Sequence, residues 1–303
     1  MIRSFLTALL VLTFCSHATS QRCFDPLQPV TSTNAADWND LVKFVPPAVQ
    51  EEGVVRLQTI DSGYGNKINL DFYSITFRKD PTRSLPEVFR DLRTHFSSFA
   101  HAEATAYTDA SGNYFLPYRS TSAADDRLSI QNKKLWESAN PKGAVMSFVL
   151  RYHTPALALA ATLRGLKIVL EQGDVLVTCA NPTDFIFSTV YTEKDTYHPV
   201  NGNRGFGIKE NTDGKTWTFY SKGADRETKM DSGLPYFGNV ALHNGAMSPE
   251  IEKGPDAVFQ AGDKFWREFF SNMAEFLNRE GLTVDDLSFI RNTSRHDYPL
   301  PQN

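Results

Sequence analysis

The sequence predicts a protein of the α+β class, with a curved antiparallel sheet of about seven strands packed on a long C-terminal helix. Two observations lead to this prediction. Strand signals follow one another closely from Gly143 to Phe219, and no helix-length segment separates them, which favours antiparallel pairing. The segment from Asp263 to Gly281 carries a broad stripe of apolar, mainly aromatic side chains that needs a covering surface. The concave face of the sheet is the expected cover.

The first 20 residues are typical of a secretory signal peptide. Arg3 precedes an apolar run at 5–15, and Ala18 and Ser20 supply the small residues expected before a cleavage site. The apolar run is shorter than the roughly 20 residues that a membrane-spanning helix needs, so we predict cleavage after Ser20 and no transmembrane anchor. Residues 21–303 are then expected to form a single secreted domain, extracellular or periplasmic.

Cysteine usage agrees with an oxidising compartment. After removal of the signal peptide, Cys23 and Cys179 remain and can form a disulfide that pins the N-terminal tail to the body. The alternative is that Cys179, inside a strand-like run, is a buried thiol. No Cys or His spacing indicates a metal site, and no cofactor is expected. Asn292 begins an Asn-Thr-Ser sequon, which a eukaryotic host could glycosylate.

Composition limits the partners. Hydrophobic residues make up 41% of the chain, enough for a substantial core and too many for a disordered chain. The formal net charge is −4, so there is no electrostatic case for nucleic acid or an anionic membrane surface as a partner. The sequence identifies no protein partner.

The first half of the domain predicts a strand and a helix followed by an insertion. Apolar alternation at 68–77 changes face near its middle, so we expect a bulge near Tyr73 and Ser74. Ser84 and Glu87 form a capping box at the start of a helix. Residues at about 100–142 are polar with scattered aromatics, and we expect a long surface insertion there.

The second half predicts hairpins and the long helix. Gly173-Asp174 indicates a hairpin turn, and Asn211-Thr212-Asp213-Gly214 indicates another. A second insertion is expected at about 223–257. Asp263 is the expected cap of the long helix, and Gly281 is its expected end.

The strand at 68–77 leads into Leu85-Pro86-Glu87-Val88-Phe89. Later, Phe185 to Lys222 contains a His198-Pro199 loop, the string Arg204-Gly205-Phe206-Gly207-Ile208 and a DG turn. Over about residues 67–280, this order of elements resembles the START and Bet v 1-like helix-grip superfamily. The resemblance implies a sheet that wraps the C-terminal helix and encloses an apolar cavity.

The implied cavity suggests a site for an apolar small molecule or lipid. A void of ~300 Å³ or more between sheet and helix would favour binding, whereas side chains that fill the space would make an ordinary core. The candidate ligand-binding side chains are Phe148, Tyr152, Phe185, Phe187, Phe219, Phe269 and Met273.

A polar cluster offers a different hypothesis. In a hairpin, the segment ending at Arg204 and the segment at 222–226 could meet, which makes His198, Arg204 and Asp225 candidate catalytic residues. His198 could carry a proton, while Arg204 or Arg226 could hold a carboxylate or phosphate. The alternative is a structural cluster in which Asp225 pairs with Arg204 and His198 holds the turn.

Three functional hypotheses therefore stay open. The first is a secreted binder of an apolar small molecule or lipid. The second is a secreted hydrolase or lyase, although the chain has no GxSxG, HExxH, P-loop or GxGxxG motif, and so nothing decides whether it is an enzyme. The third is an effector or adhesion protein that acts through the two insertions.

Overall fold

The computed structural model describes residues 22–25, 34–47, 51–100, 114–117, 126–150, 171–194, 196–233, 257–286 and 292–300. The predicted signal peptide, Tyr152 and most of the second predicted insertion lie outside these residues.

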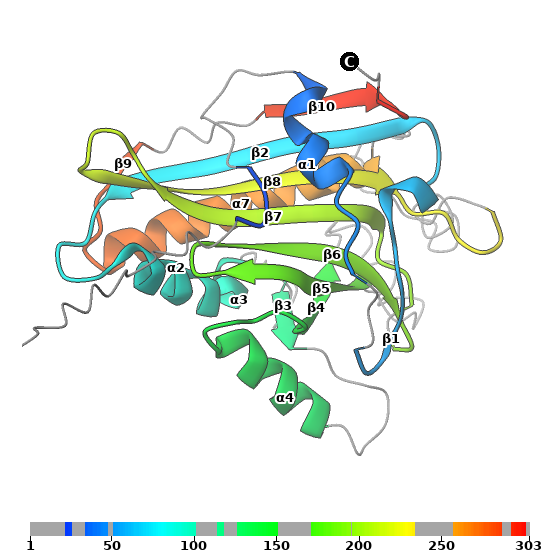
Figure 1. Ribbon diagram of the computed structural model, residues 1–303, viewed down its shortest axis with the longest axis horizontal. Helices are drawn as coiled ribbons and strands as arrows, with labels where there is room; N and C mark the ends of the chain where they lie inside the picture. Colours follow the sequence, from blue (N-terminus) through cyan, green and yellow to red (C-terminus); the bar gives the residue numbers. More distant parts are fainter. Residues whose placement is uncertain are drawn as a thin grey trace, which may run out of the picture.

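A curled antiparallel sheet forms the centre of the structure (Figure 1). Its seven principal strands run in the order β2-β8-β7-β6-β5-β4-β3, and every neighbouring pair is antiparallel. Three further strands extend it: β1 pairs with β6, while β9 and β10 pair with β2. The bounds are β1 Val54–Leu57, β2 Lys67–Arg78, β3 Tyr114–Pro117, β4 Val145–Leu150, β5 Glu171–Asn181, β6 Asp184–Thr192, β7 Val200–Glu210, β8 Thr216–Glu227, β9 Val284–Asp286 and β10 Asn292–Asp297.

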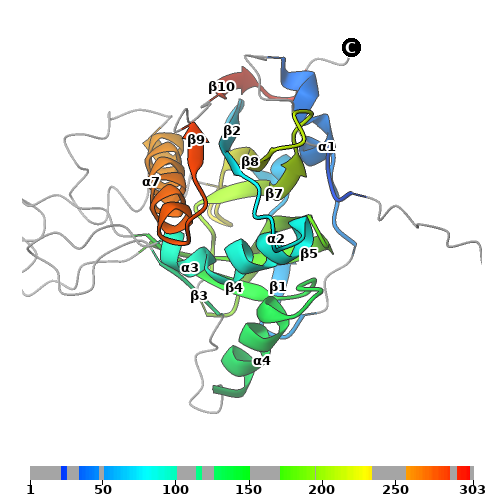
Figure 2. The ribbon, with the colours of Figure 1, turned by 90° about the vertical axis from the view of Figure 1, so that its left-hand side faces the viewer.

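Helices lie on both faces of this sheet. The long helix α7 packs against one face, and the N-terminal α1 packs against the other (Figure 2). The helices are η1 Ala35–Trp38, α1 Asn39–Val42, η2 Ile60–Ser62, α2 Leu85–Thr94, α3 Phe96–Phe99, α4 Asp126–Glu137 and α7 Ala257–Arg279. This arrangement confirms the predicted fold class, and its element order agrees with a helix grip.

The concave face holds the main core. It is mostly aromatic, and Phe96 of α3 contacts Phe206 of β7 and Phe269 of α7 at ring-centroid distances of 5.1 and 4.5 Å. Such edge-on and tilted contacts are the favourable geometries for packed rings. The face of α7 that the sequence marked as apolar is therefore covered by the sheet, as predicted.

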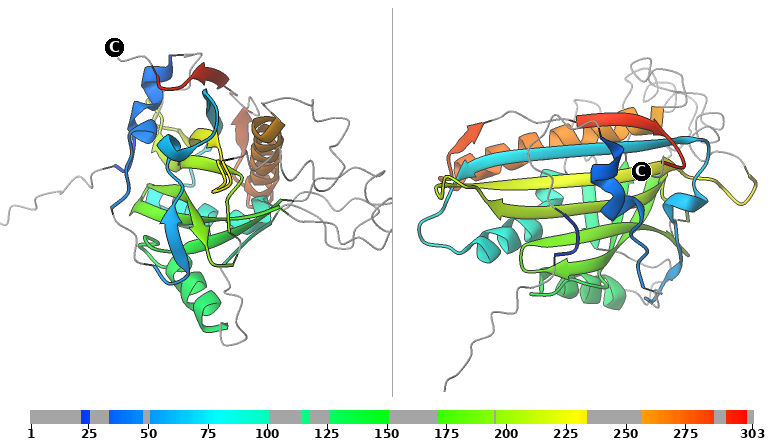
Figure 3. Two further views of the ribbon diagram at one scale, coloured as in Figure 1. Left: turned by 90° about the vertical axis from the view of Figure 1, so that its right-hand side faces the viewer. Right: turned by 45° about the horizontal axis from the view of Figure 1, so that its top comes forward.

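The convex face holds a second core under the N-terminal segment. Trp38, Leu41 and Phe24 pack there, and the indole of Trp38 donates to the carbonyl of Asp71. Figure 3 shows α1 lying over the back of the long strands. Strand β2 is therefore buried on both sides, which explains why its apolar residues change face without the expected bulge: its pairing with β8 is continuous from Asn69 to Arg78.

The predicted disulfide is formed between Cys23 and Cys179, with 5.8 Å between the two Cα atoms. The pairing of β5 with β6 shifts between Val177 and Cys179. Because side chains alternate along a strand, this irregularity lets Val177 face the main core while Cys179 reaches the convex core beside the N-terminal segment.

Two further local predictions were wrong. Gly173 and Asp174 are no turn but lie inside β5, where Gly173 pairs with Phe148 of β4. Asp263 does not cap α7, because the helix begins six residues earlier, at Ala257. The expected end is correct: Gly281 has φ +77°, a conformation that glycine adopts freely.

The first predicted insertion contributes regular structure. Within 100–142, β3 extends the sheet beside β4, and α4 supplies Trp136 to the main core. The capping box before α2 is present, with the backbone N–H of Ser84 donating to Glu87 at 2.7 Å. The sequon residue Asn292 begins β10.

Candidate functional site

The site begins as one row of residues across the concave face. Asp71 of β2 stands opposite Gly223 of β8, Gly223 opposite Arg204 of β7, and Arg204 opposite Phe187 of β6. Residues opposite one another in a sheet share a face. Since Phe187 belongs to the main core, the side chains of Asp71 and Arg204 also point toward α7.

Gly223 makes this arrangement possible. A Cβ atom at this position would lie 2.3 Å from Arg204 Nη2 and 2.5 Å from Asp71 Oδ1. Its absence lets the two long side chains meet above the middle strand, with Arg204 Nη2 donating to Asp71 Oδ2 at 2.7 Å and to Asp225 Oδ2 at 3.3 Å. Arg204 therefore bridges two buried carboxylates.

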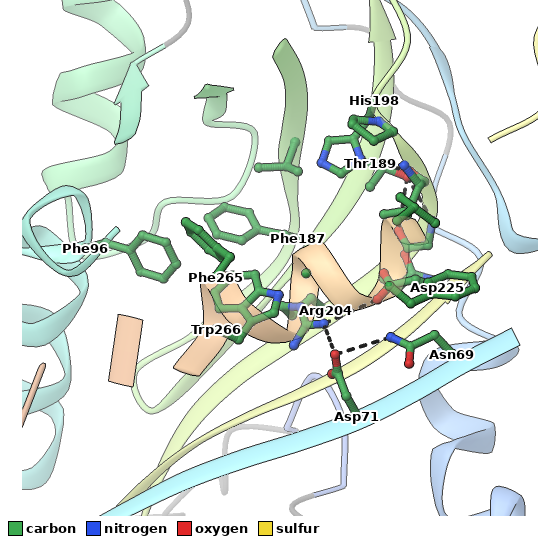
Figure 4. A pocket seen from close by; sticks show the side chains of 18 residues that line it. Asn69, Asp71, Phe96, Phe187, Thr189, His198, Arg204, Asp225, Phe265 and Trp266 are labelled. Atoms are coloured by element: carbon green, nitrogen blue, oxygen red, sulfur yellow. Dashed lines mark hydrogen bonds and ion pairs between the residues drawn. The ribbon is translucent and has the colours of Figure 1, made fainter. Parts of the chain in front are cut away.

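An open space adjoins the ion cluster that Asp71, Arg204 and Asp225 form. It measures about 90 Å³ and lies between the sheet and the first half of α7 (Figure 4). Aromatic side chains of Phe96, Phe187, Phe265 and Trp266 gather at one side, and the ion cluster lies at the other. Its remaining lining residues are Asn69, Asp71, Val175, Thr189, His198, Pro199, Val200, Gly202, Asn203, Arg204, Asp225, Val258, Phe259 and Gly262.

The guanidinium of Arg204 makes further contacts besides its two ion pairs. Its Nη1 donates to the hydroxyl of Ser221 at 3.2 Å, and its guanidinium lies 4.3 Å from the ring centroid of Trp266. Burial alone would lower the pKa of Arg204, but Asp71 and Asp225 outweigh burial and raise it. The guanidinium is therefore permanently charged.

Asp225 is the titratable member of the cluster. Burial raises the pKa of its carboxyl to about 6, and Asp71 adds to the shift while Arg204 opposes it. A carboxyl that lines a cavity and has such a pKa can accept or release a proton near neutral pH.

His198 borders the same cavity from the loop before β7. Burial lowers its pKa to about 4, so the imidazole is neutral at physiological pH. Its Nδ1 lies 2.9 Å from the carbonyl oxygen of Val200, and its carbonyl accepts from Gln58 and Thr228. Gly173 lets the ring pack against β5, because a Cβ atom there would lie 2.6 Å from the imidazole.

A second ion group lies beside the first, on the side of strand β10. Asp263 of α7 accepts from the Tyr73 hydroxyl at 3.0 Å and from Arg295 at 3.3 Å. Arg295 in turn lies over the ring of Phe259, with 4.9 Å between guanidinium carbon and ring centroid. Burial, together with Asp71 and Asp263, raises the pKa of Tyr73, so the phenol stays neutral.

The predicted catalytic residues all border the cavity, and Arg204 and Asp225 form the ion pair expected of a structural cluster. Arg226 points elsewhere, donating to the carbonyls of Ile60 and Gly65.

Of the predicted ligand-binding side chains, Phe187 borders the cavity. Phe185, Phe219, Phe269 and Met273 are almost fully buried in the main core. The side chain of Phe148 and all of Tyr152 lie outside what the structure describes.

Sequence reasoning missed Asp71 and Trp266. A signal for Asp71 was present, because Asn69 and Asp71 are the inward positions of a strand whose next inward residue is the aromatic Tyr73. Polar residues at inward positions indicate a site or a buried network. Trp266 stood in the apolar stripe of α7, and nothing distinguished it there from its aromatic neighbours.

In the part of the chain that the structure describes, no group of three or more His, Cys, Asp or Glu side chains is placed to hold a metal ion. No helix among these residues has the length and apolar character needed to cross a membrane.

No protein-family model matches the chain, and no curated protein matches it. Solved structures with some likeness include Ms6760 from Mycobacterium smegmatis, with TM-score 0.29 and 11% identity over 75% of this chain and 99% of that one. Ara h 8.0201 has TM-score 0.26 and 7% identity, over 67% of this chain and 98% of that one. The di-domain ARO/CYC StfQ from the steffimycin biosynthetic pathway has TM-score 0.26 and 10% identity, over 56% and 51%. These scores are low, so the description of the fold depends on the element order of this chain alone.

Proposed function

We propose that this chain is an exported protein that binds a small, mainly apolar molecule between its sheet and α7. The observation that carries the proposal is the cavity, which combines an aromatic wall with a few buried polar groups. This combination is typical of small-molecule sites, where apolar contact supplies affinity and a few polar groups fix orientation.

The volume of the cavity limits the size of the ligand. About 90 Å³ is well below the volume that drug-sized ligands occupy, which is roughly 300 Å³ or more. The proposed ligand is therefore a small molecule, or one end of a longer one. A whole lipid chain does not fit among the aromatic side chains that fill the main core.

Gly262 offers a direct test. It lies on α7 and borders the cavity, and a Cβ atom there would meet no other atom within 4 Å. Gly262→Leu should fill the space, and it should favour the helix, since glycine costs about 1 kcal/mol relative to good helix formers. Arg267→Leu adds the same side chain at an exposed position of α7 and serves as the matched control.

The measurement is native mass spectrometry of the purified chain, together with calorimetric titration with hexan-1-ol. We expect wild type and Arg267→Leu to bind, and Gly262→Leu to bind at least about tenfold more weakly, the discrimination that a filled apolar pocket commonly gives. Equal binding by all three proteins would show that the ligand lies elsewhere. A wild-type protein that carries no small molecule in native mass spectrometry and binds neither hexan-1-ol nor another six-carbon probe would refute the proposal.

A second candidate is a hydrolase or lyase, and the observation that favours it is the raised pKa of Asp225 at the cavity wall. In such an enzyme, Asp225 would move the proton and His198 would border the substrate. Asp225→Asn should then abolish turnover while substrate binding persists. Retained turnover in that variant would remove this candidate.

Export is part of the proposal. It is supported by the Cys23–Cys179 disulfide, which oxidising compartments favour, and by the signal-like first 20 residues. N-terminal sequencing of protein recovered from the medium or periplasm should begin at Gln21. Recovery of an uncleaved chain with two free thiols from the cytosol would contradict it.

A further inference from the structure

The ion cluster beside the cavity has more negative than positive groups. Asp71 and Asp225 face Arg204. With these three groups ionised, they carry one net negative charge together. Of the described titratable side chains next to it, Tyr73 and His198 are neutral near pH 7, and Asp263 pairs with Arg295.

The remaining buried cations of β8 do not balance this charge, because they serve the convex side. Lys222 pairs with Asp40 of α1 at 2.6 Å, and Arg226 donates to backbone carbonyls. Among the described residues, the negative charge therefore lies at the cavity wall.

Beside Arg204 the unsatisfied buried group is an acceptor, whereas the unsatisfied buried donor, Arg295 Nε, belongs to the neighbouring ion group with Asp263. Within the described part of the chain, the buried Asp71 Oδ1 accepts no hydrogen bond. The terminal nitrogens of Arg204 are already used, Nη1 by Ser221 and Nη2 by both Asp71 and Asp225. One face of its guanidinium is covered by Trp266. An incoming anion would meet two carboxylates beside a guanidinium that is already paired.

An incoming cation, in contrast to an anion, would meet attractive groups at this wall of the cavity. Asp225 borders the cavity and holds Arg204 only at 3.3 Å, the longer of the two contacts. Phe187 and Phe265 border the same space, and aromatic faces attract cations. Burial raises the pKa of the Asp225 carboxyl, and a further cation beside it would favour the ionised form.

We infer that the ligand of this cavity is a small amphiphilic amine, with its ammonium against Asp225 and its apolar body against the aromatic wall. This inference rests on the proposed binding function and adds the chemical class of the ligand. It excludes carboxylates and phosphates as preferred ligands.

The test uses three probes with the same six-carbon chain: hexylamine, hexan-1-ol and hexanoate. Calorimetric titration of the intact protein at pH 7.5 should show hexylamine binding at least about tenfold more tightly than hexan-1-ol, and hexanoate binding most weakly, as expected for one uncompensated charge in a partly buried site. Hexanoate or hexan-1-ol binding as tightly as hexylamine would overturn the inference and leave the binding function intact. No binding of any probe would refute the binding function itself.

Asp225→Asn separates charge from shape. It should reduce hexylamine affinity at least about tenfold and change hexan-1-ol affinity by less than about threefold, because the amide keeps the volume and loses the charge. Asp297→Asn makes the same chemical change at an exposed side chain paired with Lys67 and should alter neither affinity. Unchanged hexylamine binding by a folded Asp225→Asn protein would contradict the assigned contact.

Discussion

The two titratable groups at the cavity should oppose each other in acid, and this can be measured. Burial lowers the pKa of His198 from 6.5 to about 4. Burial raises the pKa of Asp225 from 3.8 to about 6. Each pKa unit corresponds to 1.36 kcal/mol of folding free energy, so each group contributes about 3 kcal/mol of pH-dependent stability, with opposite signs.

The signs follow from proton counts. Between pH 4 and 6.5, native His198 binds fewer protons than the unfolded chain does, so its contribution to stability rises with pH. Between pH 4 and 6, native Asp225 binds more protons than the unfolded chain does, so its contribution falls with pH. In the wild type the two nearly cancel.

A single substitution at His198 or at Asp225 should reveal the contribution of the other residue to the pH dependence of stability. The assay is urea unfolding at pH 4 and at pH 6.5, and the quantity is the change in unfolding free energy between them. Relative to wild type, Asp225→Asn should lose about 3 kcal/mol more on acidification, and His198→Gln should lose about 3 kcal/mol less. Comparison with wild type removes the contributions of all other carboxylates.

The double variant His198→Gln with Asp225→Asn should return to the wild-type pH dependence, because both terms are removed. Single variants that parallel the wild type within about 0.5 kcal/mol would refute the reasoning, since they would show that neither group titrates abnormally in the native state.

Three further predictions concern stability. Replacing Cys23 and Cys179 by serine opens a link across 156 residues, which should reduce unfolding free energy by about 5 kcal/mol in urea; equal stability of oxidised wild type and variant would contradict this. Phe269→Ala empties a fully buried position and should cost about 3–5 kcal/mol, visible as a lower urea midpoint, whereas an unchanged midpoint would place Phe269 outside the core. Arg204→Met leaves two buried carboxylates unpaired and should cost about 3–5 kcal/mol at pH 7.5, and the loss should shrink in acid; a pH-independent loss would point to packing alone.

Much of the fold could be predicted because its signals are local. The capping box at Ser84, the DG turn after β7 and the apolar stripe of α7 each need only a few neighbouring residues to interpret. The errors came where burial on a distant element decided the outcome. Asp263 has the sequence character of a helix cap, but tertiary contact with Tyr73 and Arg295 stabilises it inside the helix.

Half of the candidate site could be predicted for the same reason. Arg204 and Asp225 stand near each other because a short turn joins β7 and β8, and hairpin geometry determines which residues meet. Asp71 could not be placed, since it lies 133 positions from Arg204 and its strand joins β8 only in the folded sheet. The closest ion pair of the site was therefore missed.

The concave face changes from apolar to charged side chains along β7 and β8, and this change bears on function. Toward one end, β7 and β8 present Phe206, Ile208 and Phe219 to α7, and this apolar packing is sufficient to bury a helix. Toward the other end, the same strands present Arg204 and Asp225, and a buried ion cluster is no more stabilising than apolar side chains of the same volume. Stability alone therefore gives no reason for the change of chemistry. The change coincides with the end of close packing, where the open space begins. That coincidence supports a role of the cluster in ligand recognition. The interaction of a charged or polar group with a ligand is strongest in a site from which water is excluded.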